Sequence, residues 1–323
     1  MARPPCGCRA IGVFAAPRPR LLGRARAGEA AVGAGTYARR MSRPPTFTPP
    51  PCARALQLPT RRGHFAVLDA RPEGTPRGTA LLMPGFTGSK EDFIAMLEPL
   101  TAAGYRVVAV DGRGQYESEG PHSQEAYAQE ELAADVLAQA DAVGAPVHLV
   151  GHSLGGQIAR AAVLTDAEPF RTLTLISSGP ARIAPSQEER VRLLSEALAL
   201  TNMDMERVWE GIQAMEPPEE TSVDGTDLRR RWLRHNPVQL ITTGRQLTVE
   251  PDRVAELAAV SPLPKHVMSG VRDDTWPVPL LDTMARRLEA RRTVIEGAEH
   301  SPNTDQPLRT AAALSAFWDD SER

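Results

Sequence analysis

The sequence predicts an α/β protein in which a mostly parallel central sheet is flanked by helices. From Thr79 onward, short apolar runs alternate with helix-like stretches, which is typical of parallel strands joined by helical crossovers. A charged, largely helical segment interrupts this alternation before the last two strands. We therefore expect a helical cap inserted before the penultimate strand. The expected organisation is a leader over 1–52, a first core part over 53–180, the cap over 181–264 and a second core part over 265–323.

Each core element has its own signal. An opening strand pair is predicted at "ARALQL" and "HFAVLDA", and apolar runs predict further strands at "TALLMPG", "YRVVAVD", "PVHLVG", "FRTLTLISSG", "KHVMSG" and "RRTVIEG". In the first helix, "SKEDFIAMLEPLTAAG", Ser89 can cap the start with Asp92 at the third helical position, and Gly104 ends it. The other core helices are predicted at "QEAYAQEELAADVLAQADAVG", "GQIARAAVL", "PLLDTMARRLEA" and through "AAALSAFW".

The first 40 residues differ in composition from the rest of the chain. They hold eight arginines and one acidic residue, Glu29, although the whole chain has a formal net charge of −3. Because such a segment buries too little apolar surface to fold, we expect 1–52 to be a disordered basic and proline-rich leader, with Met41 as an alternative start of translation. A targeting segment is the other interpretation. The acidic remainder argues against nucleic acid as a partner.

Cysteine usage and hydropathy exclude further classes of protein, namely disulfide-stabilised, zinc-binding and membrane-spanning ones. The three cysteines, Cys6, Cys8 and Cys52, do not suggest a disulfide framework. No Cys/His cluster has zinc spacing, so we expect neither a metal nor a cofactor. No apolar stretch approaches the roughly 20 residues that span a bilayer, and the expected location is the cytoplasm. The sequence contains no signal for the oligomeric state.

The stretch "VHLVGHSLGG" places a serine at a junction between a strand and a helix. A very sharp turn of this kind forces its central residue to a positive φ and brings the neighbouring backbones together. Side chains two positions before and after would clash, which explains Gly151 and Gly155. The hydroxyl of Ser153 then projects above the sheet at the positive end of a helix, as a nucleophile requires.

A serine nucleophile needs a base that is held by a third group. In this architecture the chain order is nucleophile, acid and base, so the base should follow the last strand, where His300 stands in "IEGAEHSPNTDQP". The acid should follow "KHVMSG", where Asp273 and Asp274 are adjacent and residue types alone do not choose between them. The oxyanion needs two N–H donors, for which we expect Leu154, after the nucleophile, and Phe86 in "PGFTGSK".

Four motifs stand in a fixed order: "PGFTGS", "DGRGQYESEGP", "GHSLGG", and "GVRDDTWP" followed by "GAEHSPNTDQP". Through them the chain, from about residue 60 onward, resembles the α/β-hydrolase superfamily, in particular its capped serine hydrolases of esterase or lysophospholipase type. The resemblance implies Ser153 as nucleophile, His300 as base and Phe86 as oxyanion donor. Its G-x-x-D-x-x-x-P loop selects Asp273 over Asp274.

Two positions depart from the family pattern. Pro84 replaces the histidine that often precedes the oxyanion-loop glycine, and Tyr116 replaces the second spaced glycine of the D-x-R-G-x-G-x-S loop. Both loops line the pocket in the family, so these departures bear on the substrate. They do not affect the three residues of the implied triad.

The resemblance implies hydrolysis of a carboxylic ester or thioester of a small apolar substrate through an acyl-enzyme. Acyl transfer, including perhydrolysis, would use the same triad, and a non-catalytic ligand-binding protein is the third hypothesis. The cap carries an apolar face that includes Trp209, and part of this face should line the pocket. His152, Trp209 and Trp276 are the residues assigned to that pocket.

Overall fold

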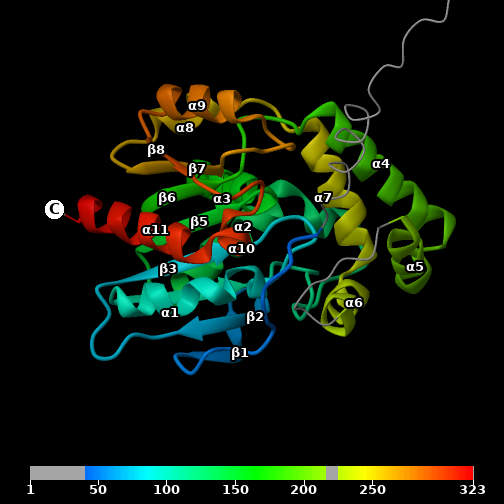
Figure 1. The fold of residues 1–323 in the computed structure, drawn as a ribbon, viewed down its shortest axis with the longest axis horizontal. Coiled ribbons are helices and arrows are strands. Elements are labelled where there is room, and N and C mark those ends of the chain that lie inside the picture. Colours follow the sequence, from blue (N-terminus) through cyan, green and yellow to red (C-terminus); the bar gives the residue numbers. More distant parts are fainter. Residues whose placement is uncertain (1–40, 216–224, 323) are drawn as a thin grey trace, which may run out of the picture. The chain divides into compact units, whose positions relative to one another are not determined.

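The computed structural model describes residues 41–215 and 225–322 (Figure 1). It contains one eight-stranded sheet with the order β1-β2-β4-β3-β5-β6-β7-β8. Where β1 pairs with β2 and β2 with β4, the strands are antiparallel, and all other pairs are parallel. The predicted fold class is therefore confirmed. The strands are β1 (Ala53–Thr60), β2 (Gly63–Ala70), β3 (Gly78–Met83), β4 (Tyr105–Val110), β5 (Val147–His152), β6 (Phe170–Ile176), β7 (Lys265–Gly270) and β8 (Arg291–Ile295).

Helices cover both faces of the sheet. On one face, α1 (Ile94–Ala102) and α11 (Pro307–Ser321) bury Leu97, Leu314 and Phe317 against the strands. On the other, α2 (Gln129–Val143), α3 (Leu154–Thr165) and α9 (Val278–Arg287) bury side chains such as Val136 and Ile158. The sheet is thus enclosed between two apolar layers, as the unbroken apolar runs of its parallel strands require.

The helix before β4 begins with a tighter turn than the sequence predicts. A 3₁₀ helix, η1 (Lys90–Phe93), precedes α1, and at its start the carboxylate of Asp92 accepts from the N–H of Ser89 at 3.3 Å, which is one half of the expected capping box. Gly104 follows the helix at φ +92°, which favours glycine. The helix predicted from Gln124 is divided: η2 (Gln124–Tyr127) forms its start and α2 follows from Gln129. One short element, α10 (Pro302–Asp305), precedes α11 and lies outside the predicted set.

Between β6 and the penultimate strand β7, the chain forms a helical cap. It contains α4 (Pro185–Leu200), α5 (Met205–Met215), α6 (Gly225–Arg234) and α7 (Pro237–Val249), which lie together beyond one end of the sheet in Figure 1. Their shared apolar core, here called the cap cluster, consists of Leu198, Met205, Val208, Trp209, Leu228, Trp232 and Leu240.

Two boundaries in the structure differ from the expected organisation. The helix α8 (Val254–Ala259), expected within the cap, instead packs against α3 and α9 on the face of the sheet. Residues 41–52, expected within the leader, are described by the structure, and Phe47 packs against the cap cluster. The expectation for residues 1–40 lies outside the described residues.

No helix in the described ranges is long and apolar enough to cross a membrane. The fold places the residues expected to act in catalysis at the carboxyl ends of the parallel strands. The loops after β3, β5, β7 and β8 all emerge there, and they carry every residue that the sequence analysis assigned to catalysis.

Candidate active site

Ser153 occupies a strained turn between β5 and α3. Its φ is +53° and its ψ is −119°, a conformation that L-residues rarely adopt. The two glycines of the motif explain how the turn closes. A Cβ atom on Gly151 would lie 2.4 Å from the carbonyl oxygen of Gly155, and one on Gly155 would lie 2.5 Å from the carbonyl oxygen of Met83. Only glycine fits at either position without moving the backbone.

The loops after β7 and β8 bring Asp273 and His300 to this serine. The Nε2 atom of His300 lies 3.1 Å from the Oγ atom of Ser153, and its Nδ1 atom lies 2.9 Å from Oδ1 of Asp273. Asp274 is not part of this chain of contacts: its side chain is about half exposed and accepts a hydrogen bond from Gln187. The structure therefore brings Ser153, His300 and Asp273 together across nearly 150 residues of sequence.

Asp273 is held as an ionised, buried carboxylate. Its Oδ1 atom accepts hydrogen bonds from the backbone N–H groups of Thr275, at 2.9 Å, and Trp276, at 3.0 Å. Burial by itself raises the pKa of Asp273, but the facing His300 and these backbone donors outweigh it, so the pKa is lower than usual. A carboxylate in this state orients the imidazole and stabilises its positive charge.

The pKa of His300 shifts in the opposite direction. Burial lowers the pKa of this imidazole, but the charge of Asp273 and the hydrogen bond with it outweigh burial, so the pKa is raised above its ordinary value. An imidazole with a raised pKa accepts a proton more readily, which suits the role of base that the sequence predicts for His300.

The loop after β3 approaches the nucleophile closely. A Cβ atom on Gly85 would lie 3.3 Å from the Cβ atom of Ser153, so the peptide that carries the N–H of Phe86 lies beside the serine. Leu154 is the first residue of α3, where backbone N–H groups face outward along the helix axis. The side chain of Phe86 contacts both the sheet core and the cap cluster, and Gly244 in α7 leaves room for its ring.

His152, expected in the pocket, is almost fully buried and contacts the loop of His300. Its Nε2 atom lies 2.9 Å from the carbonyl oxygen of His300, which only accepts hydrogen bonds. The imidazole therefore carries its proton on Nε2. Burial, together with the nearby His300, lowers the pKa of His152 to about 4, which keeps this donor neutral. His152 thus supports the loop that carries His300.

The two tryptophans expected in the pocket also make structural contacts. Trp209 lies within the cap cluster, 6.5 Å from the ring of Trp232. Trp276 is fully buried, and its indole N–H donates to the carbonyl oxygen of Ala181 at 2.8 Å. Protein atoms enclose both rings, and their place in a substrate pocket stays a prediction. Trp276 connects the loop of the acid to the start of the cap.

A buried ion pair that the sequence analysis missed joins both ends of the cap to α3. Arg160 donates to Glu250 at 2.6 Å and to the carbonyl oxygen of Pro180 at 2.8 Å. Pro180 precedes the cap and Glu250 follows α7, so one side chain holds both connections. The sequence offers no signal for this pair, because an arginine and a glutamate 90 positions apart form no motif.

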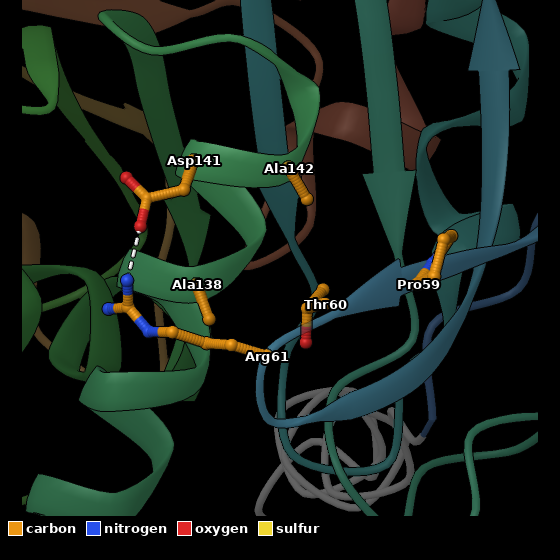
Figure 2. Close-up of a pocket in the computed structure, with 6 residues that line it drawn as sticks. All are labelled: Pro59, Thr60, Arg61, Ala138, Asp141 and Ala142. Atoms are coloured by element: carbon orange, nitrogen blue, oxygen red, sulfur yellow. Dashed lines mark hydrogen bonds and ion pairs between the residues drawn. The ribbon is translucent and has the colours of Figure 1, made fainter.

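A shallow pocket elsewhere on the sheet is shown in Figure 2. It lies between the end of β1 and the C-terminal part of α2, and an ion pair between Arg61 and Asp141 borders it. Because α2 leads into the start of β5, this pocket lies at the opposite end of that strand from Ser153. In the two described ranges, no group of three or more His, Cys, Asp or Glu side chains is arranged to hold a metal ion.

Comparisons with known proteins show which family and which relatives the chain resembles. A model of the alpha/beta hydrolase family matches residues 80–313. The chain is 30% identical over 203 residues to a 2-hydroxy-6-oxononadienedioate/2-hydroxy-6-oxononatrienedioate hydrolase of Dechloromonas aromatica. The aligned residues make up 60% of this chain and 68% of that protein. The chain is also 30% identical over 183 residues to a pimeloyl-[acyl-carrier protein] methyl ester esterase of Aeromonas hydrophila. These aligned residues make up 53% of this chain and 69% of that protein.

Solved structures show the same fold. A thermophilic esterase from Thermogutta terrifontis superposes with a TM-score of 0.66 at 22% sequence identity, covering 84% of this chain and all of that one. At this level of sequence identity the likeness concerns the fold.

Proposed function

Because this chain belongs to the alpha/beta hydrolase family, we propose that it is a serine hydrolase that cleaves a carboxylic ester or thioester of a small apolar substrate. The observation that carries the proposal is the hydrogen-bonded chain from Ser153 through His300 to Asp273. The relative named as a methyl ester esterase supports the ester class.

In the proposed first step, the Oγ atom of Ser153 attacks the substrate carbonyl carbon while its proton moves to Nε2 of His300. The carbonyl π electrons move to oxygen, and the N–H groups of Phe86 and Leu154 donate to this oxyanion. As the tetrahedral intermediate collapses, the bond to the alcohol or thiol breaks. His300 returns its proton to the leaving group, and an acyl-Ser153 ester remains.

In the second step, water loses a proton to His300 and attacks the acyl carbon, and the resulting intermediate expels Ser153. His300 reprotonates the serine, and the carboxylic acid leaves. Throughout both steps Asp273 stays ionised and stabilises the imidazolium, which agrees with the lowered pKa of its carboxyl group.

The apolar surroundings of Phe86 favour an apolar acyl or alkyl group. Its ring lies between the sheet core and the cap cluster, and Val191 of α4 approaches the same face of Gly244. A substrate carbonyl beside Ser153 would therefore extend its substituent along these side chains. A small-molecule substrate and a cytoplasmic location belong to the same proposal.

The test is the burst of nitrophenol from a short nitrophenyl ester. The wild-type protein should release a burst equal to its concentration and then turn over, whereas Ser153→Ala should release none. A fluorophosphonate should label Ser153 with one equivalent. A wild-type protein that neither hydrolyses a panel of esters and thioesters nor reacts with the fluorophosphonate would exclude the proposal and favour a ligand-binding role.

The same assay separates hydrolysis from acyl transfer. Added alcohol, amine or peroxide competes with water for the acyl-enzyme, and the product ratio reports the preference. We expect the free acid to dominate at millimolar nucleophile; predominant transfer to the added nucleophile would reassign the protein as an acyltransferase or perhydrolase.

A further inference from the structure

A buried glutamine from another loop holds the loop after β3. Gln115 follows β4 and is 5% exposed. Its Nε2 atom donates to the carbonyl oxygen of Gly85 at 2.8 Å and lies 3.4 Å from that of Phe86. Its Oε1 atom accepts from the N–H of Gly112 at 3.1 Å. Because both ends of the amide are bonded, the network fixes its orientation, with NH₂ toward the oxyanion loop.

The carbonyl that Gln115 binds belongs to the same peptide unit as the N–H of Phe86. A trans peptide is planar, and its C=O and N–H point in opposite directions. A hydrogen bond that holds the carbonyl of Gly85 toward Gln115 therefore turns the N–H of Phe86 away from Gln115. Ser153 approaches the same glycine, since a Cβ atom on Gly85 would lie 3.3 Å from its Cβ atom.

The loop that carries Gln115 has an unusual backbone. Gly114 has a φ of +71° and Tyr116 a φ of +40°, so both neighbours of Gln115 adopt left-handed conformations. Asp111 fixes this loop to the oxyanion loop, because its carboxylate accepts from the backbone N–H of Lys90 at 2.7 Å and of Glu117 at 3.2 Å. The side chain of Gln115 is therefore held in place before any substrate binds.

We propose that Gln115 is a positioning residue for the oxyanion donor, and that it orients the peptide between Gly85 and Phe86 so that the Phe86 N–H faces the developing negative charge. This inference rests on the proposed function of Ser153. A hydrogen bond to the carbonyl also polarises the peptide, which makes its N–H a stronger donor. Because the oxyanion forms only in the transition state, the contribution should affect kcat rather than KM.

The experiment compares Gln115→Ala and Gln115→Glu with a matched control, Gln246→Ala. Gln246 makes the same kind of bond, from its side-chain amide to the carbonyl oxygen of Tyr127, but on α7. Both Gln115 variants should lose about ten- to a hundred-fold in kcat, less than the loss of a whole donor, with KM within about two-fold. Glutamate keeps the size of the side chain but, when ionised, cannot donate.

A boronic acid gives a second readout, because its tetrahedral adduct with Ser153 places an oxygen where the oxyanion forms. Its affinity should fall by the same factor as kcat in both Gln115 variants, while the affinity for the product acid should stay unchanged. The control variant should keep wild-type values for all three quantities. Thermal unfolding of each variant establishes that the measured protein is folded.

A third readout does not depend on turnover. In Gln115→Ala without substrate, the amide ¹⁵N–¹H resonance of Phe86 should move, and in Gln246→Ala it should not. An unmoved resonance, or a kcat within two-fold of wild type in a protein that needs Ser153, would overturn the inference. Absence of any Ser153-dependent turnover, with the resonance shifted as expected, would refute the proposed function while the positioning by Gln115 stands.

Discussion

At the scale of single residues, two non-glycine residues with a positive backbone φ, Ser153 and Tyr116, shape the site. Ser153 is strained because the turn places its hydroxyl beside His300. Tyr116 stands at a position where the family pattern has glycine, and its φ of +40° explains that pattern. Such a conformation costs on the order of 1–3 kcal/mol. Contacts of its ring with Lys90, 4.6 Å away, and of its hydroxyl with Arg230 of the cap, 3.1 Å away, offset part of this cost.

The raised pKa of His300 predicts the acid limb of the activity profile. The imidazole must be neutral to accept a proton from Ser153, so kcat/KM should fall as the pH drops through this raised pKa, with a midpoint above 6.5. In Asp273→Asn, the charge that raises the pKa is lost while burial still lowers it. We therefore expect the midpoint to move to lower pH and kcat to fall on the order of 10⁴-fold.

The neighbouring Asp274→Asn is the control for this pH profile. It removes a carboxylate of the same loop that is about half exposed and does not contact His300. Its kcat should stay near that of the wild type, and its acid limb should move less than in Asp273→Asn, because the charge of Asp274 raises the pKa of His300 less than Asp273 does. The measurement is a pH–rate profile of each variant with the same ester. A larger loss of kcat in Asp274→Asn than in Asp273→Asn would assign the role of the acid to Asp274.

At the scale of elements, the cap is attached to the core through α6. Arg231 of this helix and Asp92 of η1 form an ion pair at 2.9 Å, and both side chains are fully buried. Ser42 completes the cluster, because its hydroxyl donates to Asp92 and its carbonyl oxygen accepts from Arg231. The segment before β1 thus joins the same contact. The cap therefore depends on charges that have no access to water in this conformation.

Removal of the arginine should leave a buried carboxylate without its partner. We expect Arg231→Leu to lower the free energy of unfolding by about 3–5 kcal/mol, measured by urea denaturation. Arg229→Leu, on the same helix, removes an exposed pair with Glu206 and should leave the unfolding midpoint almost unchanged. The double variant Arg231→Leu/Asp92→Leu removes both charges. If it regains stability, the unpaired charge is the cause of the loss in Arg231→Leu. If Arg231→Leu, Arg229→Leu and the double variant all lose the same free energy of unfolding, packing is the cause instead.

At the scale of the whole molecule, the sequence predicts the elements of the core more completely than the contacts between them. The alternation of apolar runs and helical patterns predicts the strands correctly, because burial on both faces constrains every residue of a parallel strand. The motif order likewise brings Ser153, Asp273 and His300 to one end of the sheet. These features are local, or depend only on where a strand ends.

Contacts between distant side chains could not be predicted in the same way. Gln115 has no distinctive residue type, and its role depends on a carbonyl 30 positions away. Trp276 is assigned to the pocket from the sequence, which does not predict that its indole N–H donates to the carbonyl oxygen of Ala181, before the cap. The position of α8 on the sheet, rather than in the cap, depends on how the chain returns after α7. Each of these depends on packing in three dimensions, which periodicity does not encode.

Buried histidines predict how the whole fold responds to acid. Burial lowers the pKa of His148, His152 and His235 to about 4, and of His266 to about 3. In the unfolded chain these groups take up protons near pH 6.5, so the unfolded state binds more protons below that pH. The free energy of unfolding should therefore be highest above pH 7 and fall between pH 6.5 and 4. The slope is about 1.4 kcal/mol per pH unit for each such histidine.

His300 contributes with the opposite sign, because its raised pKa stabilises the fold below pH 6.5, but it is one histidine against four. Urea denaturation at a series of pH values measures the slope. His148→Asn removes one titrating group while an oxygen remains near Thr172, and should reduce the slope by one proton. A stability that stays flat from pH 7 to 4.5 would mean that the buried histidines become accessible to protons without unfolding.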